Sequence, residues 1–139
     1  MKAMLSHAAG GPDTLTLGDV SEPVPGAGQV RIAVKACGIN FPDTLIIRDR
    51  YQLRPVRPFS PGAEVSGVVD AVGDGVSHPV VGQRVIGWAG FGGLAEKLVL
   101  PATQCIPMPD TMSFETASAF LMTYGTSHHA LKDLSLIHI

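Results

Sequence analysis

Short runs of alternating apolar and polar residues dominate the first hundred positions of the chain. In the clearest run the apolar residues share one face: Val30, Ile32, Val34 and Ala36. Arg31 and Lys35 fall on the opposite face, the pattern of a half-buried β-strand. Further strands are predicted at 2–7, 14–20, 64–72, 80–86 and 95–100. The 16 glycines and 11 prolines separate these runs without repeating, which predicts a mainly β domain with many turns.

Helical signals are short in the first part of the chain and stronger near its end. Pro42 suits the first turn of a short helix, because its missing N–H would be unpaired there. Ser113 is a good N-cap, and an amphipathic stripe follows it. The stripe is formed by Phe114, Ala117, Ser118 and Leu121. A second helical stretch is predicted from Thr123 to about Asp133, so a β-rich module ends in helices.

Composition narrows the class of protein. Apolar residues make up 45% of the 139 residues and charged residues 16%, which predicts a folded core rather than disorder. The net charge of −2 and the lack of a basic stripe argue against a nucleic-acid partner. No apolar run has membrane-spanning length and no leader pattern opens the chain, so we expect a cytoplasmic protein without a membrane partner.

Several motifs that would carry chemistry are incomplete. Gly73 and Gly75 begin a dinucleotide fingerprint, but a strand-like run rather than a helix follows them, so a β-turn is expected. His128 and His129 are adjacent on a predicted helix and point about 100° apart, which indicates a surface or domain-interface role. No set of His, Cys, Asp and Glu has zinc spacing, and no serine elbow occurs.

Two segments remain as candidates for a site. In the first, residues 36–43, Asn40 stands where a strand turns into a helix and is either a helix cap, a site residue or both. Cys37 in the same segment is interpreted as a small core residue. In the second, residues 59–64, Glu64 opens an apolar strand and needs a partner, which an ion pair with a nearby arginine would supply.

These segments together resemble the GroES-like domain of the medium-chain dehydrogenase/reductase superfamily. The resemblance is carried by Gly62-Ala63-Glu64-Val65-Ser66-Gly67-Val68-Val69, by Val72-Gly73 with Val81-Gly82-Gln83-Arg84-Val85, and by Gly92-Gly93-Leu94-Ala95-Glu96. With Met1-Lys2-Ala3 it extends to about Asp133. The resemblance implies a mainly β fold, a GroES-like partly open β-barrel with short helices, followed by the first helices of a Rossmann domain.

Two positions bear on zinc within this superfamily. Zinc alcohol dehydrogenases read roughly CGxCHTD and GHE at the two segments, where this chain has Asn40 and Ala63 in place of the cysteine and histidine. Neither side chain is a normal zinc ligand, so no metal site is expected. Gly38-Ile39-Asn40-Phe41-Pro42-Asp43 resembles the GIN-x-x-D signature of the zinc-independent, quinone-reductase (zeta-crystallin-like) branch.

The resemblance implies hydride transfer from NADPH to a quinone or another conjugated carbonyl (enone). It places Asn40 and Tyr51 beside the nicotinamide and the acceptor, and Thr126 near the nicotinamide carboxamide. Asp43 either orients that site or only caps the short helix. The alternatives are an enoyl- or acryloyl-CoA reductase of the same superfamily and a non-catalytic GroES-like binding module. The physiological acceptor and the choice between NADPH and NADH stay open.

The expected organisation is a substrate domain at 1–120, the start of a nucleotide-binding domain at 121–133 and a non-native tail at 134–139. In this interpretation the chain is the N-terminal fragment of a parent enzyme, which the resemblance predicts to be a homodimer. Because no phosphate-binding loop is present, the chain alone is expected to be inactive.

Overall fold

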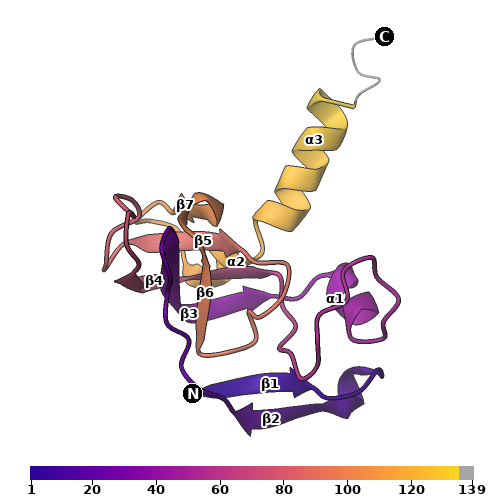
Figure 1. Ribbon diagram of the computed structural model, residues 1–139. Coiled ribbons are helices and arrows are strands. Elements are labelled where there is room, and N and C mark those ends of the chain that lie inside the picture. Colours follow the sequence, from indigo (N-terminus) through magenta and orange to yellow (C-terminus); the bar gives the residue numbers. More distant parts are fainter. Residues whose placement is uncertain (135–139) are drawn as a thin grey trace.

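Two antiparallel sheets form the body of the protein in the computed structural model, which describes residues 1–134 (Figure 1). The N-terminal hairpin pairs β1 (Lys2–Ser6) with β2 (Leu15–Asp19). The second sheet has five strands in the order β6-β3-β4-β5-β7. Its strands are β3 (Gln29–Gly38), β4 (Glu64–Val72), β5 (Arg84–Trp88), β6 (Lys97–Pro101) and β7 (Cys105–Pro107). The prediction of a mainly β fold with short helices is confirmed.

Helices connect the strands and then leave the body. The 3-10 turns are Pro12–Thr14 and Ala102–Gln104, and the α-helices are α1 (Phe41–Ile46), α2 (Phe114–Ser118) and α3 (Thr126–Lys132). A π-helix, Leu121–Gly125, runs directly into α3. Figure 1 shows α3 projecting away from the sheets. Residues 135–139 lie outside the described part of the chain, so the predicted tail is not tested.

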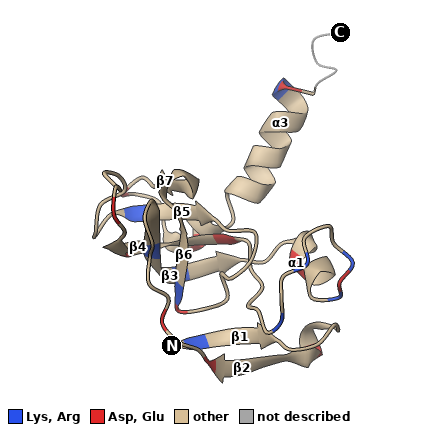
Figure 2. Cartoon of the chain, viewed as in Figure 1, with Lys and Arg blue, Asp and Glu red and all other residues tan. Residues whose placement is uncertain are grey.

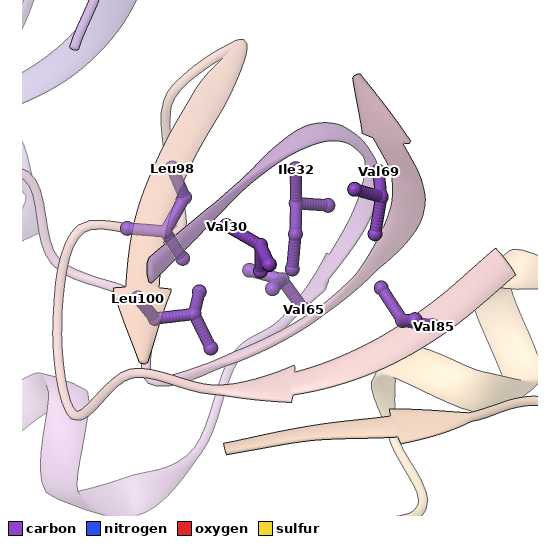
Figure 3. Close-up of a cluster of buried hydrophobic side chains, with 7 residues drawn as sticks. All are labelled: Val30, Ile32, Val65, Val69, Val85, Leu98 and Leu100. Carbon is purple, nitrogen blue, oxygen red and sulfur yellow. The ribbon is translucent and has the colours of Figure 1, made fainter. Parts of the chain in front are cut away.

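The main core lies against the central strands of the larger sheet. Figure 3 shows its seven side chains, Val30, Ile32, Val65, Val69, Val85, Leu98 and Leu100, converging from β3, β4, β5 and β6. Val30 and Ile32 are fully buried as predicted, whereas Val34 is only half-buried. The strict alternation fails because the pairing of β3 with β4 shifts register twice, between Arg31 and Ile32 and between Val34 and Ala36.

Two predicted strand boundaries are wrong. The strand expected at 80–86 begins only at Arg84, because Val80–Gln83 forms a turn in which the Gln83 N–H donates to the Val80 carbonyl at 3.1 Å. Gly82 has φ +88° in this turn, a conformation that glycine tolerates best. The strand expected at 95–100 begins at Lys97, and Ala95 forms only an isolated bridge with Ala3.

The other local predictions are confirmed. Ser113 caps α2 by accepting the Thr116 N–H at 3.1 Å, and Ala117 and Ser118 of the stripe are buried. Gly75 has φ +75° in a tight turn after β4, not in a phosphate loop. The second helical stretch exists, but its first turn, beginning at Leu121, is π rather than α.

Candidate active site

Asn40 and Asp43 are joined at the start of α1. Asn40 is the N-cap residue, and its backbone N–H donates to Oδ2 of Asp43 at 2.8 Å. This is the return bond of a capping box, in which the third residue of the helix binds back to the cap. Asn40 therefore stands at the predicted N-cap position, and the Asp43 side chain caps the same helix.

Asp43 also reaches the second candidate segment. It is only 5% exposed, and its Oδ1 accepts the Gly62 N–H at 3.0 Å. Gly62 has φ +95°, and an added Cβ would lie 2.6 Å from Sγ of Cys37, so glycine is required here. One buried carboxylate thus fixes the segment that begins α1 against the segment that begins β4.

Glu64 is fully buried at the first position of β4 and has no arginine partner within residues 1–134. The predicted ion pair is wrong. Its Oε2 accepts the side-chain amide of Asn40 at 3.2 Å. Its Oε1 accepts the backbone N–H of Leu121 through a short hydrogen bond and that of Met122 at 3.3 Å. These N–H groups begin the terminal helix, where a carboxylate is favoured by the unpaired donors and the helix dipole.

Thr126 lies beyond this carboxylate, on the rim of a depression of about 360 Å³. The depression is lined by Trp88, Leu121, Met122, Gly125, Thr126 and His129. Met122 therefore belongs to both features, since its N–H binds Glu64 and the residue lines the depression. Through Glu64 the structure links Asn40 to the helix that carries Thr126.

Tyr51 follows α1, and its predicted place beside the acceptor stays a prediction. It packs, partly buried, against the small apolar cluster of Ile46, Ile47 and Phe59 behind α1. In the part of the chain that the structure describes, no hydrogen bond joins Tyr51 to Asn40 or Thr126. Asn40, Asp43 and Glu64 thus form one connected set that reaches the Thr126 helix, and Tyr51 stands outside it.

Cys37 packs against the main core, as its interpretation as a core residue predicted. Burial raises the pKa of the Cys37 thiol to about 12, and the carboxylates of Asp43 and Glu64 add to the effect. A thiol with so high a pKa is a poor nucleophile at neutral pH. His128 and His129 are exposed on α3, as predicted, and His129 pairs with Asp133 at 2.8 Å.

Metal-ligating groups and membrane-spanning helices can be judged for the described residues. Within residues 1–134, no group of three or more His, Cys, Asp or Glu side chains is arranged to hold a metal ion. None of the helices in this range is long and apolar enough to cross a membrane.

Some parts of the site were missed by sequence reasoning. The donors from Leu121 and Met122 are backbone groups, which no residue type announces. Trp88 had a signal, since it is the single tryptophan and ends a strand directly before a glycine-rich loop.

The fold and these segments define a domain class. The sequence model of the alcohol dehydrogenase GroES-like domain family matches residues 26–110, so the chain belongs to this family. Among curated relatives, the quinone oxidoreductase-like protein 2 homolog of Nematostella vectensis is 46% identical over 108 residues, covering 77% of this chain and 30% of the relative.

Solved structures agree. The human synaptic vesicle membrane protein VAT-1 homolog-like protein has a TM-score of 0.93 at 35% identity, covering 96% of this chain and 43% of its own. The Escherichia coli quinone oxidoreductase complexed with NADPH has a TM-score of 0.87 at 30% identity, covering 96% and 41%. The chain therefore spans less than half the length of each of these relatives. The resemblance to the quinone-reductase branch is confirmed at the level of this domain.

Proposed function

We propose that this chain is the substrate-side domain of an NADPH-dependent reductase that transfers hydride to a quinone or another conjugated carbonyl without zinc. The observation that carries the proposal is the Glu64 carboxylate, which binds the Asn40 amide and the N–H groups of Leu121 and Met122. This arrangement fixes Asn40, at the end of one segment, relative to the helix that presents Thr126. The relatives named quinone oxidoreductase support the same reading.

The donor set at Glu64 supports chemistry without zinc. Both oxygens of Glu64 accept hydrogen bonds from N–H donors. Ala63 precedes Glu64 in the sequence, and Asn40 is hydrogen-bonded to it. A metal would need soft or imidazole ligands at those positions, and an alanine offers none. In this proposal Glu64 holds protein N–H groups in place and does not act as a metal ligand.

The residues of this chain would bind and orient the reactants. One N–H of the Asn40 amide is used by Glu64, and the second can donate to the carbonyl oxygen of an acceptor. Among residues 1–134 the Thr126 hydroxyl makes only a long contact of 3.9 Å with Sδ of Met122, so it is available to a carboxamide at the pocket. When bound, a reduced nicotinamide supplies the hydride. The apolar walls from Trp88, Leu121 and Met122 would limit water.

The proposed parent is larger than this chain. The domain boundary near residue 120, the homodimer and the cytoplasmic location stay predictions, and the pyrophosphate of the cofactor would bind outside residues 1–134. Gly73 and Gly75 form a turn, and no Gly-rich loop in the described residues opens a helix that could hold it.

The test is a cofactor-oxidation assay on a full-length protein that carries this chain, with quinones and enones as acceptors. Thr126→Val removes the hydroxyl but keeps the shape, and we expect kcat/KM to fall about tenfold, the effect of losing about 1.5 kcal/mol of hydrogen bonding. Ser127→Ala is the matched control, because its hydroxyl only bonds back to the Thr123 carbonyl at 2.9 Å. Equal activity of the two variants would refute the role of Thr126, and inactivity with every acceptor would refute the proposed reaction.

A further inference from the structure

Arginines gather in the segment that follows α1. Four of the ten basic residues of the chain, Arg48, Arg50, Arg54 and Arg57, fall within ten positions, with Asp49 as the only acid among them. Figure 2 shows basic residues on the loop that follows α1. Asp49 is already engaged, since its Oδ1 binds Nη1 of Arg57 at 2.8 Å. Arg48 and Arg50 form no ion pair within the described residues.

These two arginines share one depression with a stretch of small residues. The depression, of about 310 Å³, is lined by Ala9, Gly10, Gly11, Arg48 and Arg50. Two guanidinium groups beside one hollow repel each other, and an anion between them would turn that repulsion into attraction. The hollow lies outside the set formed by Asn40, Asp43 and Glu64, so it is independent of the proposed function.

The backbone around the hollow is already arranged. Nη1 of Arg48 donates to the Thr44 carbonyl at 2.6 Å, which holds this side chain against the end of α1. The Gly10 N–H is used by the Ile47 carbonyl at 3.0 Å, and the Gly11 carbonyl accepts from Thr14. The Gly11 N–H has no acceptor among the hydrogen bonds of residues 1–134. It is a donor beside two cations, as in backbone sites that bind oxyanions.

One carboxylate lies near the hollow. An added Cβ at Gly11 would lie 2.6 Å from Oδ1 of Asp13 and 3.4 Å from Nη2 of Arg48. Asp13 nevertheless makes no ion pair with Arg48 within 4.0 Å. Its charge would weaken the binding of a second anion without filling the hollow, and this effect can be measured.

We propose that the hollow formed by Gly10, Gly11, Arg48 and Arg50 binds a phosphate group of a soluble small molecule. Phosphate fits better than a halide because its several oxygens can accept from two guanidinium groups and a backbone N–H together. The site would anchor a phosphorylated ligand on the face behind α1.

The experiment is a titration of the isotope-labelled chain with inorganic phosphate at low ionic strength, followed by the amide signals of Gly10 and Gly11. Sodium chloride at the same ionic strength is the control. We expect saturable shifts of both glycines with phosphate, at about millimolar affinity, and none with chloride. Shifts that are equal for both salts would overturn the proposal.

Charge-matched variants test the residues. Arg50→Gln removes an exposed side chain that lines the hollow and should weaken phosphate binding about fivefold or more. Arg54→Gln, on the same exposed loop but not lining the hollow, should change it less than about twofold. Asp13→Asn should strengthen binding about twofold to threefold. Equal losses for the two arginine variants would indicate a diffuse charge effect and overturn the site.

A membrane surface is the competing source of phosphate. Vesicles of phosphatidylserine and phosphatidylcholine, mixed with the chain and sedimented, distinguish the two. We expect the chain to stay in the supernatant. The proposal would be overturned if the chain sedimented with the vesicles, Arg50→Gln abolished this, and inorganic phosphate did not shift the glycine amide signals. The loop would then bind a lipid surface and not a soluble phosphate.

Discussion

The Asp43 carboxylate accepts the Gly62 N–H at 3.0 Å, which ties α1 to the turn that precedes β4. The other oxygen of the same group caps α1 through Asn40. Because the carboxylate is buried, both donors would be left unpaired if it were removed. Its first role is therefore to fix the position of Asn40 relative to the segment that contains Glu64.

Asp43→Ala should lower the free energy of unfolding by about 3 kcal/mol, since it leaves the buried Gly62 N–H and the partly buried Asn40 N–H without their acceptor. Urea unfolding followed by circular dichroism measures this. Thr44→Val is the control, because the Thr44 hydroxyl only bonds to the Phe41 carbonyl in an exposed position, and it should cost less than about 1 kcal/mol. A loss for Asp43→Ala no larger than that of the control would contradict the bridging role.

Zinc binding should be absent in the natural sequence and partly restorable. Elemental analysis of the purified chain should give well under one zinc per molecule, because Asn40 and Ala63 stand beside Glu64. The double variant N40C/A63H would add a thiolate and an imidazole next to that carboxylate, and we expect it to retain zinc after dialysis. Stoichiometric, chelator-resistant zinc in the unaltered protein would contradict the zinc-free proposal.

Cys37 should react slowly with thiol reagents while the protein is folded. Burial raises its pKa from 9.0 to about 12, so the thiolate fraction near neutral pH falls about a thousandfold. The reaction of a Cys105→Ser variant with a disulfide reagent at about pH 8 should therefore be at least a hundredfold slower than in guanidinium. Similar rates in the two conditions would show that the thiol is accessible and ionised.

Acid should destabilise the protein through a network of four charged residues. Arg31 and Lys97 each bind both Glu22 and Asp70, at 2.6 to 3.0 Å, across β3, β4, β6 and the loop after β2. The hydrogen bond from Lys97 lowers the pKa of Glu22. Burial pushes the pKa of Asp70 upward, but hydrogen bonds from Arg31 and Lys97 outweigh it and lower that pKa overall.

A lowered folded-state pKa means that the stabilisation is complete above the unfolded values of 4.5 and 3.8 and is lost as pH falls through the lower folded values. Unfolding free energy measured from about pH 7 down to pH 3 should therefore drop mainly below about pH 4.5. Asp70→Asn should lower the unfolding free energy by about 1 kcal/mol at neutral pH and reduce its decrease below about pH 4.5. Asp110→Asn lies outside the network and should do neither. An unchanged acid limb in Asp70→Asn would exclude the network as the cause.

Much of the fold could be predicted because strands and caps depend on local sequence. The alternation around Val30 and Ile32 and the cap at Ser113 identify their elements from a few neighbouring residues. The boundary at Arg84 could not be found in this way, since Val80 and Val81 favour strand by residue type while Gly82 turns the backbone. The two register shifts of β3 likewise depend on its partner β4 and not on its own sequence.

The site was predicted less completely. Asn40 was identified from its segment and Asp43 through the family resemblance, and the structure joins them. The partner of Glu64 was wrong because a buried carboxylate signals only that donors exist, and backbone N–H groups at a distant helix start satisfy it as well as an arginine does. Tyr51 was named by resemblance alone, and its role stays a prediction; its side chain packs against the cluster of Ile46, Ile47 and Phe59.

The π-turn at Leu121–Gly125 gives the terminal helix a rotational setting. A π-turn holds about one residue more than an α-turn, and each residue of an α-helix turns the chain by about 100°. If one residue between Leu121 and Gly125 were deleted as the segment relaxed into an α-helix, later side chains would keep nearly the same angle. If all five residues were retained, the same relaxation would carry every later side chain around the axis by about that angle. Thr126 would then leave the hollow beside Trp88, although its residue type and its neighbours were unchanged. The π geometry of this turn therefore sets the direction in which Thr126 points, whatever residue stands at that position.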